Sequence, residues 1–199
     1  CEAAAAELAA LGTCIALPAD LGQMSEIERV AAEIGAREEQ LHILVNNAGA
    51  SWGASIDAFP ESGWDKVMNL NLKAPFFLLQ KLLPVLERAG RATDPARVIN
   101  IGSVDGMHLP VFENFSYAPS KAGLHHLTRM LAAHLAKRHI NVNTIAPGPF
   151  ETEMMRPMIE KMGFDMDKIT GPTILYEGPV RQGAGYFSST GTSERMRFG

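Results

Sequence analysis

The chain has 199 residues, of which 46% are hydrophobic and 20% charged, enough for one substantial core in an ordinary soluble globular protein. Its formal net charge of -4 offers no basic field for a phosphate backbone, so the composition argues against nucleic acid as a partner. Two cysteines are too few for a disulfide framework, and no apolar run reaches the roughly 20 residues that span a bilayer. We therefore expect a cytoplasmic protein without a membrane segment.

The first part of the chain alternates helical and strand-like patterns. An alanine-rich helix over 2–11 is stopped by Gly12, and the short apolar run Thr13 to Leu17 predicts a strand before the turn at 18–20. Ser25 and Glu28 have the spacing of a capping box. Behind them, apolar residues recur at helical spacing, which predicts an amphipathic helix ending near Gly35: Ile27, Val30, Ala31 and Ile34.

Three later apolar runs have the length and continuity of strands buried on both faces: Leu41 to Val45, Arg97 to Ile101 and Ile140 to Ile145. Helical patterns separate them, one from Trp64 to Arg88 with a break or kink near its prolines, the other from Tyr117 to Arg138. This alternation predicts an α/β fold, a doubly wound, Rossmann-like parallel sheet covered on both faces. Beyond about Met162 the periodicity fades. We expect one domain over 1–162 and an irregular tail, weakly packed or disordered, over 163–199.

Tyr117 and Lys121 place a phenol and an ammonium four residues apart, on one face at the start of a predicted helix. A neighbouring positive charge favours the phenolate, so we expect Lys121 to lower the pKa of Tyr117 and fit it for proton transfer. The alternative is a surface pair, because one Tyr-x-x-x-Lys arises by chance in roughly one chain in five.

Two further polar residues stand where ligands bind or where a helix does not favour them. Ser103 follows the end of a predicted parallel strand, where a hydroxyl can bond a substrate carbonyl. Its alternative is a turn serine after Gly102. Asn71 lies inside a predicted helix, where its side chain competes with backbone hydrogen bonds, and such misfits are tolerated most readily at functional sites. The alternative for Asn71 is a solvent-facing position. No metal site is predicted, since adjacent His125 and His126 point to different sides of a helix.

Five motifs follow one another at a characteristic spacing: Asn46-Asn47-Ala48-Gly49, Asn71, Ser103, Tyr117-x-x-x-Lys121 and Pro147-Gly148. Together they resemble the short-chain dehydrogenase/reductase family over roughly Cys14 to Met158. Three segments are most similar to the subgroup that includes 3-oxoacyl carrier-protein reductases of the rhamnolipid-pathway type: 51–53, 62–68 and 98–103.

The resemblance implies a catalytic set of Asn71, Ser103, Tyr117 and Lys121. Tyr117 would be the general acid for ketone reduction or the base for alcohol oxidation, with Ser103 orienting the carbonyl. Lys121 would lower the pKa of the phenol and hold the nicotinamide ribose, and Asn71 would anchor a water that relays protons to Lys121. The reaction implied is hydride transfer between NADP or NAD and a small ketone or secondary alcohol, with a 3-oxoacyl thioester as one substrate.

The resemblance also implies a set of cofactor-binding residues that includes Tyr117 and Lys121. The others would line the adenosine side of the cofactor or close over the nicotinamide: Asp20, Asn46, Ala48, Gly49, Pro147, Gly148 and Thr152. Asp20 and Thr152 have an alternative reading as turn or capping residues. Family members of this kind form homodimers or homotetramers, which is the assembly that the resemblance implies.

Two family features are not recognisable. The first strand, the glycine-rich turn and the second strand, whose end selects NAD or NADP, are absent, and no last strand is evident after Met162. The sequence therefore predicts an incomplete domain, and it does not indicate whether the cofactor is NAD or NADP. One alternative function is a catalytically inactive fragment or binding remnant. Within the enzymes, a sugar or polyol dehydrogenase is the second alternative.

Overall fold

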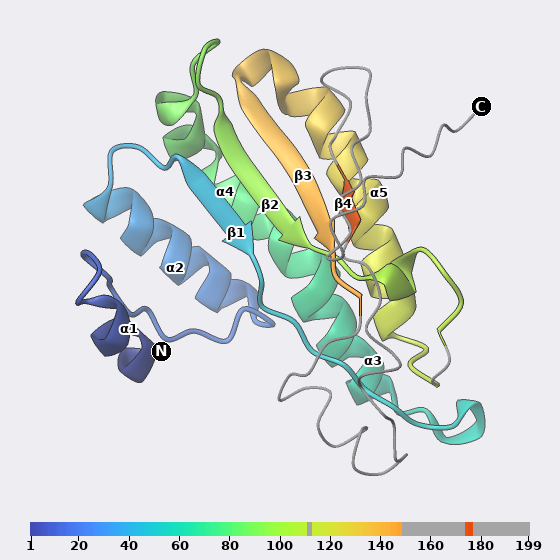
Figure 1. The fold of residues 1–199 in the computed structure, drawn as a ribbon. Helices are drawn as coiled ribbons and strands as arrows, with labels where there is room; N and C mark the ends of the chain where they lie inside the picture. The colour runs from blue at the N-terminus through green and yellow to red at the C-terminus, as the bar shows by residue number, and fades with distance from the viewer. Residues whose placement is uncertain (111–112, 149–173, 177–199) are drawn as a thin grey trace.

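The computed structural model describes residues 1–110, 113–148 and 174–176, which form a four-stranded sheet with helices packed against it (Figure 1). The strand order is β1-β2-β3-β4. The first three strands are parallel: β1 (Ile43–Asn46), β2 (Ala96–Ile101) and β3 (Ile140–Ala146). Ile43 pairs with Arg97 on β2, and Ala96 pairs with Ile140 on β3. The α/β class expected from the sequence is therefore confirmed.

Helices connect the parallel strands as crossovers. Between β1 and β2 the chain forms α3 (Glu61–Met68), the π-helix η2 (Asn69–Lys73) and α4 (Ala74–Ala89). Between β2 and β3 it forms the short 3-10 helix η3 (Val104–Gly106), α5 (Tyr117–Leu135) and the 3-10 helix η4 (Ala136–Arg138). The remaining helices are α1 (Glu2–Leu8), α2 (Met24–Arg37) and the 3-10 helix η1 (Ile56–Ala58).

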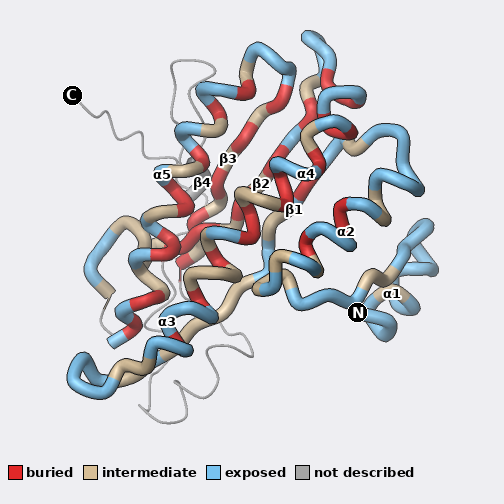
Figure 2. Tube along the Cα trace, turned by 180° about the vertical axis from the view of Figure 1, so that it is seen from behind, coloured by how far each residue is buried: buried red, intermediate tan, exposed pale blue. Residues whose placement is uncertain are grey.

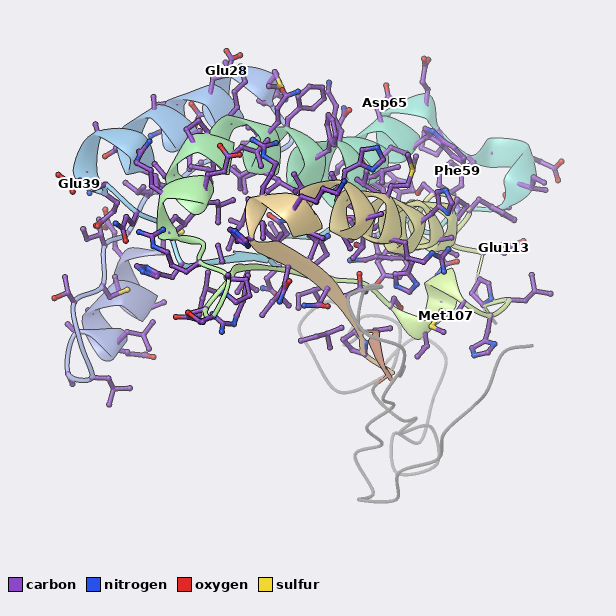
Figure 3. All side chains as sticks on the ribbon, turned by 90° about the horizontal axis from the view of Figure 1, so that it is seen from above. Glu28, Glu39, Phe59, Asp65, Met107 and Glu113 are labelled. Carbon is purple, nitrogen blue, oxygen red and sulfur yellow. The ribbon has the colours of Figure 1, made fainter. Side chains whose placement is uncertain are left out.

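The core lies between one face of the sheet and the helices α2, α4 and α5, which gather on that face (Figure 3). Strand β3 alternates buried and half-buried residues, because successive side chains of a strand point to opposite faces. The helices contribute one apolar stripe each, visible as buried stretches facing the sheet (Figure 2). The most buried side chains of the core include Ile27, Leu79, Leu82, Leu86, Val98 and Ile140. Among the described residues, the opposite face keeps Ile43 and Val45 of β1 exposed.

Some expected elements differ from those observed. The segment Thr13 to Leu17 forms no strand. Among the described residues β1 is the last strand on its side of the sheet, and this segment does not pair with it. The capping box is also wrong: α2 begins at Met24, so Ser25 lies inside the helix, and the N-cap is Gln23 without a side-chain capping bond.

The tail expected to be irregular contains one short strand, β4 (Ile174–Tyr176), antiparallel to β3. The expected boundary at 162/163 and most of the expected tail lie outside the described residues. In the part of the chain that the structure describes, no helix is long and apolar enough to cross a membrane.

Candidate active site

The site is built where the parallel strands end. β1 leads into Asn46–Gly49 and β2 leads into Gly102 and Ser103, and the carboxyl ends of parallel strands share one edge of a sheet. Helix α5 begins at Tyr117, and hydrogen bonds join its start to Ile101, the last residue of β2, and to Ser103 in the loop that follows. The predicted catalytic residues therefore lie near the carboxyl ends of the parallel strands, where the sequence predicted the site.

Tyr117 and Ser103 meet through a hydrogen bond between their side chains. Ser103 is buried, and its Oγ also accepts the backbone N–H of Asp105 at 3.1 Å. The pKa of the Tyr117 phenol is raised because burial disfavours its anion, with the Asp105 carboxylate adding to the rise and the Ser103 bond opposing it. The net shift of the Tyr117 pKa is therefore upward rather than the lowering expected from Lys121, since burial of the ring outweighs the other effects.

Lys121 is buried, with 5% of its surface exposed. Its Nζ donates to the carbonyl oxygen of Ile101 at 2.7 Å and lies 5.5 Å from the centre of the Tyr117 ring. Burial lowers the pKa of Lys121 to about 8. The ammonium has three donors, and the Ile101 bond uses one of them, which leaves capacity for ligand oxygens.

Asn71 is almost fully buried, in the π-helix between α3 and α4. Its Oδ1 accepts the Ala50 N–H at 2.8 Å, and its Nδ2 donates to the Ala50 carbonyl at 2.9 Å and to Ser120 Oγ at 3.0 Å. Ser120 in turn donates to the Tyr117 carbonyl at 2.6 Å. Asn71 is thus a clamp: its side chain joins the segment after β1 to the first turn of α5. The π-helix that carries it is a single-turn π-bulge, a feature frequently found at functional sites. The solvent-facing alternative is wrong.

Gly49 lies between these groups. A Cβ at this position would sit 3.5 Å from Asn71 Oδ1 and 3.8 Å from Lys121 Nζ, in ordinary contact distance. Ala48 beside it is exposed. The predicted small-residue segment therefore passes directly in front of the Asn71 and Lys121 side chains.

Asn46 is held by the sheet. Its Nδ2 donates to Asn100 Oδ1 at 2.8 Å, and Asn100 donates to Thr128 Oγ1 at 2.8 Å. Thr144 also donates to Thr128, at 2.8 Å, so buried and half-buried polar side chains link all three parallel strands to α5. This chain of bonds fixes the strand ends from which the site residues project.

The remaining predicted cofactor residues are less closely tied to the catalytic set. Asp20 is exposed, and its Oδ1 accepts the Gly22 N–H at 3.0 Å, which is the turn role weighed as its alternative. Pro147 follows β3, and its carbonyl accepts the Val104 N–H at 3.1 Å, so it adjoins the Ser103 loop, with Gly148 buried next to it. Thr152 lies outside the described residues.

Sequence reasoning missed the roles of Ser120 and His125. Ser120 stands in the first turn of α5, where a serine has no distinctive periodic signal. From the sequence, His125 is considered only as a metal ligand, and that role is argued against. Its Nε2 accepts the backbone N–H of Ser103 at 3.3 Å. In the structure the missing side chain of Gly102 makes room for the imidazole, but no sequence pattern connects Gly102 with His125.

Comparison with known proteins places the chain in a family. The sequence pattern of the short chain dehydrogenase family matches residues 1–163. The chain is 44% identical over 194 residues to the rhamnolipids biosynthesis 3-oxoacyl-[acyl-carrier-protein] reductase of Pseudomonas aeruginosa, covering 97% of the chain and 76% of that protein. It is 33% identical over 156 residues to the NAD-dependent glycerol dehydrogenase of Listeria innocua, covering 78% of the chain and 59% of that protein.

Among solved structures, the Pseudomonas aeruginosa RhlG/NADP active-site complex matches with a TM-score of 0.75 and 49% identity, covering 80% of this chain and 62% of that one. The chain therefore spans less than two thirds of some of the proteins it matches. The motifs along the sequence, the parallel sheet with its site at the strand ends, and these matches agree. The chain belongs to the short chain dehydrogenase family.

Proposed function

We propose that the protein is an NAD(P)-dependent oxidoreductase that transfers hydride between nicotinamide and a ketone or secondary alcohol. The observation that carries this proposal is the grouping of Tyr117, Ser103 and Lys121 at one sheet edge. The phenol is hydrogen-bonded to Ser103, and the Lys121 ammonium lies 5.5 Å from the Tyr117 ring centre. A proton donor, a hydroxyl and a cation within one site are groups that the protein can supply for reduction of a carbonyl by a hydride from nicotinamide.

Tyr117 would give its Oη proton to the carbonyl oxygen as that oxygen gains negative charge. Its raised pKa keeps the phenol protonated at neutral pH, which suits a proton donor in the reducing direction. Ser103 Oγ would donate a hydrogen bond to the same oxygen and orient it. In the oxidising direction the tyrosine would accept the alcohol proton, with the Lys121 charge favouring the phenolate that accepts it.

The residues around Lys121 fit a nicotinamide dinucleotide. Gly49 leaves open the space in front of Asn71 and Lys121, and the ammonium keeps donor capacity for ribose hydroxyls. We propose NADP or NAD as the cofactor, supported by the NADP in the solved Pseudomonas relative. When bound, the cofactor supplies or accepts the hydride. The proposed binding residues remain Asp20, Asn46, Ala48, Gly49, Tyr117, Lys121, Pro147, Gly148 and Thr152.

We propose a 3-oxoacyl thioester as the substrate. The 44% identity to the Pseudomonas reductase over 97% of the chain supports it over a polyol, since the Listeria glycerol dehydrogenase is 33% identical over 78%. An inactive binding remnant is not favoured, because Asn71, Ser103 and Lys121 all keep a network of hydrogen bonds around Tyr117. The family resemblance also leads us to propose a homodimer or homotetramer in the cytoplasm, which light scattering after size exclusion and cell fractionation would test.

The substrate proposal is tested on the full-length protein with a matched panel. The panel contains a 3-oxoacyl thioester, a ketone of equal chain length without the thioester, and glycerol. The first two are assayed with NADPH and NADH and glycerol with NADP⁺ and NAD⁺, while nicotinamide absorbance is followed. We expect the highest kcat/KM for the thioester. Preference for glycerol oxidation would replace the reductase with a polyol dehydrogenase, and saturable dinucleotide binding without turnover of any substrate would replace the enzyme with a binding remnant.

A further inference from the structure

We infer that His125 is a positioning residue that holds the backbone of Ser103 in place for the reaction. This inference rests on the proposed function for the importance of Ser103, and on hydrogen-bond geometry for the role of His125. The imidazole is buried on α5, two turns after Tyr117, and its Nε2 accepts the Ser103 N–H at 3.3 Å.

The loop after β2 explains why this bond is needed. The Gly102 N–H bonds to the Ile145 carbonyl at 2.7 Å, and the Val104 N–H bonds to the Pro147 carbonyl at 3.1 Å, both on the β3 side. Successive amides of an extended chain point to opposite sides, so the Ser103 N–H points away from β3. On that side β1 pairs with β2 only as far as Asn46. His125 therefore supplies the acceptor that a longer β1 strand would otherwise provide. Without it the Ser103 N–H would be buried without a hydrogen-bond partner, which is energetically costly.

Gly102 shows that the imidazole is closely fitted. A Cβ at Gly102 would lie 2.1 Å from His125 Nε2 and 2.8 Å from Thr144 Cγ2, both far below contact distance. The backbone just before Ser103 can therefore approach the ring only because residue 102 is a glycine. The position of Ser103 is fixed by this contact on one side and by the β3 hydrogen bonds on the other.

The bond requires a neutral imidazole with its proton on Nδ1, because a protonated ring has no acceptor. Burial first, then the positive charges of Lys121 and Arg129, lower the pKa of His125 to about 4. The other elements packed around the ring add few charges: β3 has no ionisable side chain, β2 has only Arg97 near its opposite end, and η3 carries Asp105, which accepts a bond from Asn114. The environment thus keeps His125 in the form that accepts from Ser103.

The adjacent His126 is exposed and provides a matched control on the same helix. Three variants of the chain, labelled with ¹⁵N, are compared with the wild type: His125→Leu removes the acceptor, His125→Gln retains an amide oxygen that can accept, and His126→Gln changes the neighbour. We expect the Ser103 amide to exchange with solvent at least tenfold faster in His125→Leu, with near-normal exchange in His125→Gln and His126→Gln. Equal protection of Ser103 in His125→Leu and wild type, with both folded, would overturn the inference.

The consequence for turnover is measured on the full-length protein. We expect His125→Leu to lower kcat at least tenfold while the KM for dinucleotide stays within twofold, and His125→Gln to restore most of kcat. The fall in kcat at acid pH that follows His125 protonation should be absent in His125→Gln. A loss that appears only in KM, or an equal loss in both His125 variants, would contradict a positioning role. The amide exchange needs no turnover, so an inactive wild type would overturn the proposed function and leave the Ser103 bond to be decided by exchange.

Discussion

The ammonium of Lys121 lies 5.5 Å from the centre of the Tyr117 ring, one helical turn along the same face of α5. The same ammonium is bonded to the Ile101 carbonyl at 2.7 Å, so it is directed at the end of β2 as well as at the phenol. Burial of the ring raises the pKa of Tyr117 in spite of this cation. The position of Lys121 therefore suits it to hold a ligand hydroxyl near the phenol. Any lowering of the Tyr117 pKa by Lys121 is a smaller effect than the rise caused by burial.

Replacing Tyr117 with phenylalanine should remove turnover while keeping dinucleotide binding, because the ring stays and only the transferable proton is lost. General acid catalysis contributes roughly a hundredfold to ten-thousandfold, so kcat should fall by about that factor. The measurement is steady-state reduction of a 3-oxoacyl thioester by the full-length protein, with nicotinamide fluorescence reporting binding. Near-normal kcat in Tyr117→Phe would remove this residue from the mechanism.

Replacing Lys121 with methionine should weaken dinucleotide binding and alter the pH dependence of stability. The folded-state pKa of about 8 lies below the ordinary value of 10.5, so between these values the unfolded chain holds more protons. This group therefore makes the free energy of unfolding rise with pH from 8 toward 10.5, and the gain is lost as pH falls through 8.

Urea denaturation at pH 8 and pH 9.5 tests this prediction, in a range below the raised pKa of Tyr117. The wild type should gain on the order of 1 kcal/mol relative to Lys121→Met over this interval. Lys81→Met is the control, because Lys81 is exposed and paired with Glu28 on the surface. Parallel pH curves for wild type and Lys121→Met would show that the burial of Lys121 does not shift its titration.

The sequence predicted the parallel strands and most helices because their signals are local. Continuous apolar runs at 41–45, 97–101 and 140–145 correspond to β1, β2 and β3 within a residue or two. The run at 13–17 failed because an apolar segment becomes a strand only when another strand offers hydrogen bonds, and that information is not local. Likewise, Asn71 could be recognised as unusual, but its partners Ala50 and Ser120 come from distant parts of the sequence.

The electrostatics of the site were the least predictable feature. A Tyr-x-x-x-Lys spacing shows that two groups share a helix face, but the direction of the Tyr117 pKa depends on how deeply the ring is buried, which spacing does not report. The role of His125 was hidden for a similar reason. Its partner is a backbone amide, and backbone groups leave no trace in a sequence pattern.

Replacing Asn71 with alanine should lower stability as well as turnover. It would leave the N–H and carbonyl of the half-buried Ala50 without their partner, at a cost of about 1–3 kcal/mol. Asn69→Ala is the matched control, because Asn69 stands in the same π-helix but is only half-buried. Denaturant midpoints of the two variants check this prediction, and an Asn69→Ala loss as large as that of Asn71→Ala would attribute the effect to the π-helix rather than to the clamp.

Gly106 in η3 offers a last prediction, because the backbone of α5 passes directly over it. A Cβ at Gly106 would lie 2.7 Å from the Ala122 nitrogen and 2.7 Å from the Lys121 carbonyl carbon, atoms that cannot turn aside as a flexible side chain does. Gly106→Ala must therefore push η3 away from α5, at a cost of about 1–3 kcal/mol. The Gly106 N–H bonds to the Ser103 carbonyl at 3.1 Å, so the displacement should reach Ser103 and lower kcat too.

The contrasting variant is Gly35→Ala. Gly35 is exposed within α2, and a Cβ there would meet nothing within 4 Å. Since alanine favours a helix interior over glycine by up to about 1 kcal/mol, Gly35→Ala should raise the urea midpoint and leave kcat unchanged. The two substitutions add the same methyl group, so opposite shifts in midpoint isolate the packing of η3 on α5. Wild-type stability and kcat in Gly106→Ala would show that η3 and α5 are not packed as closely in solution.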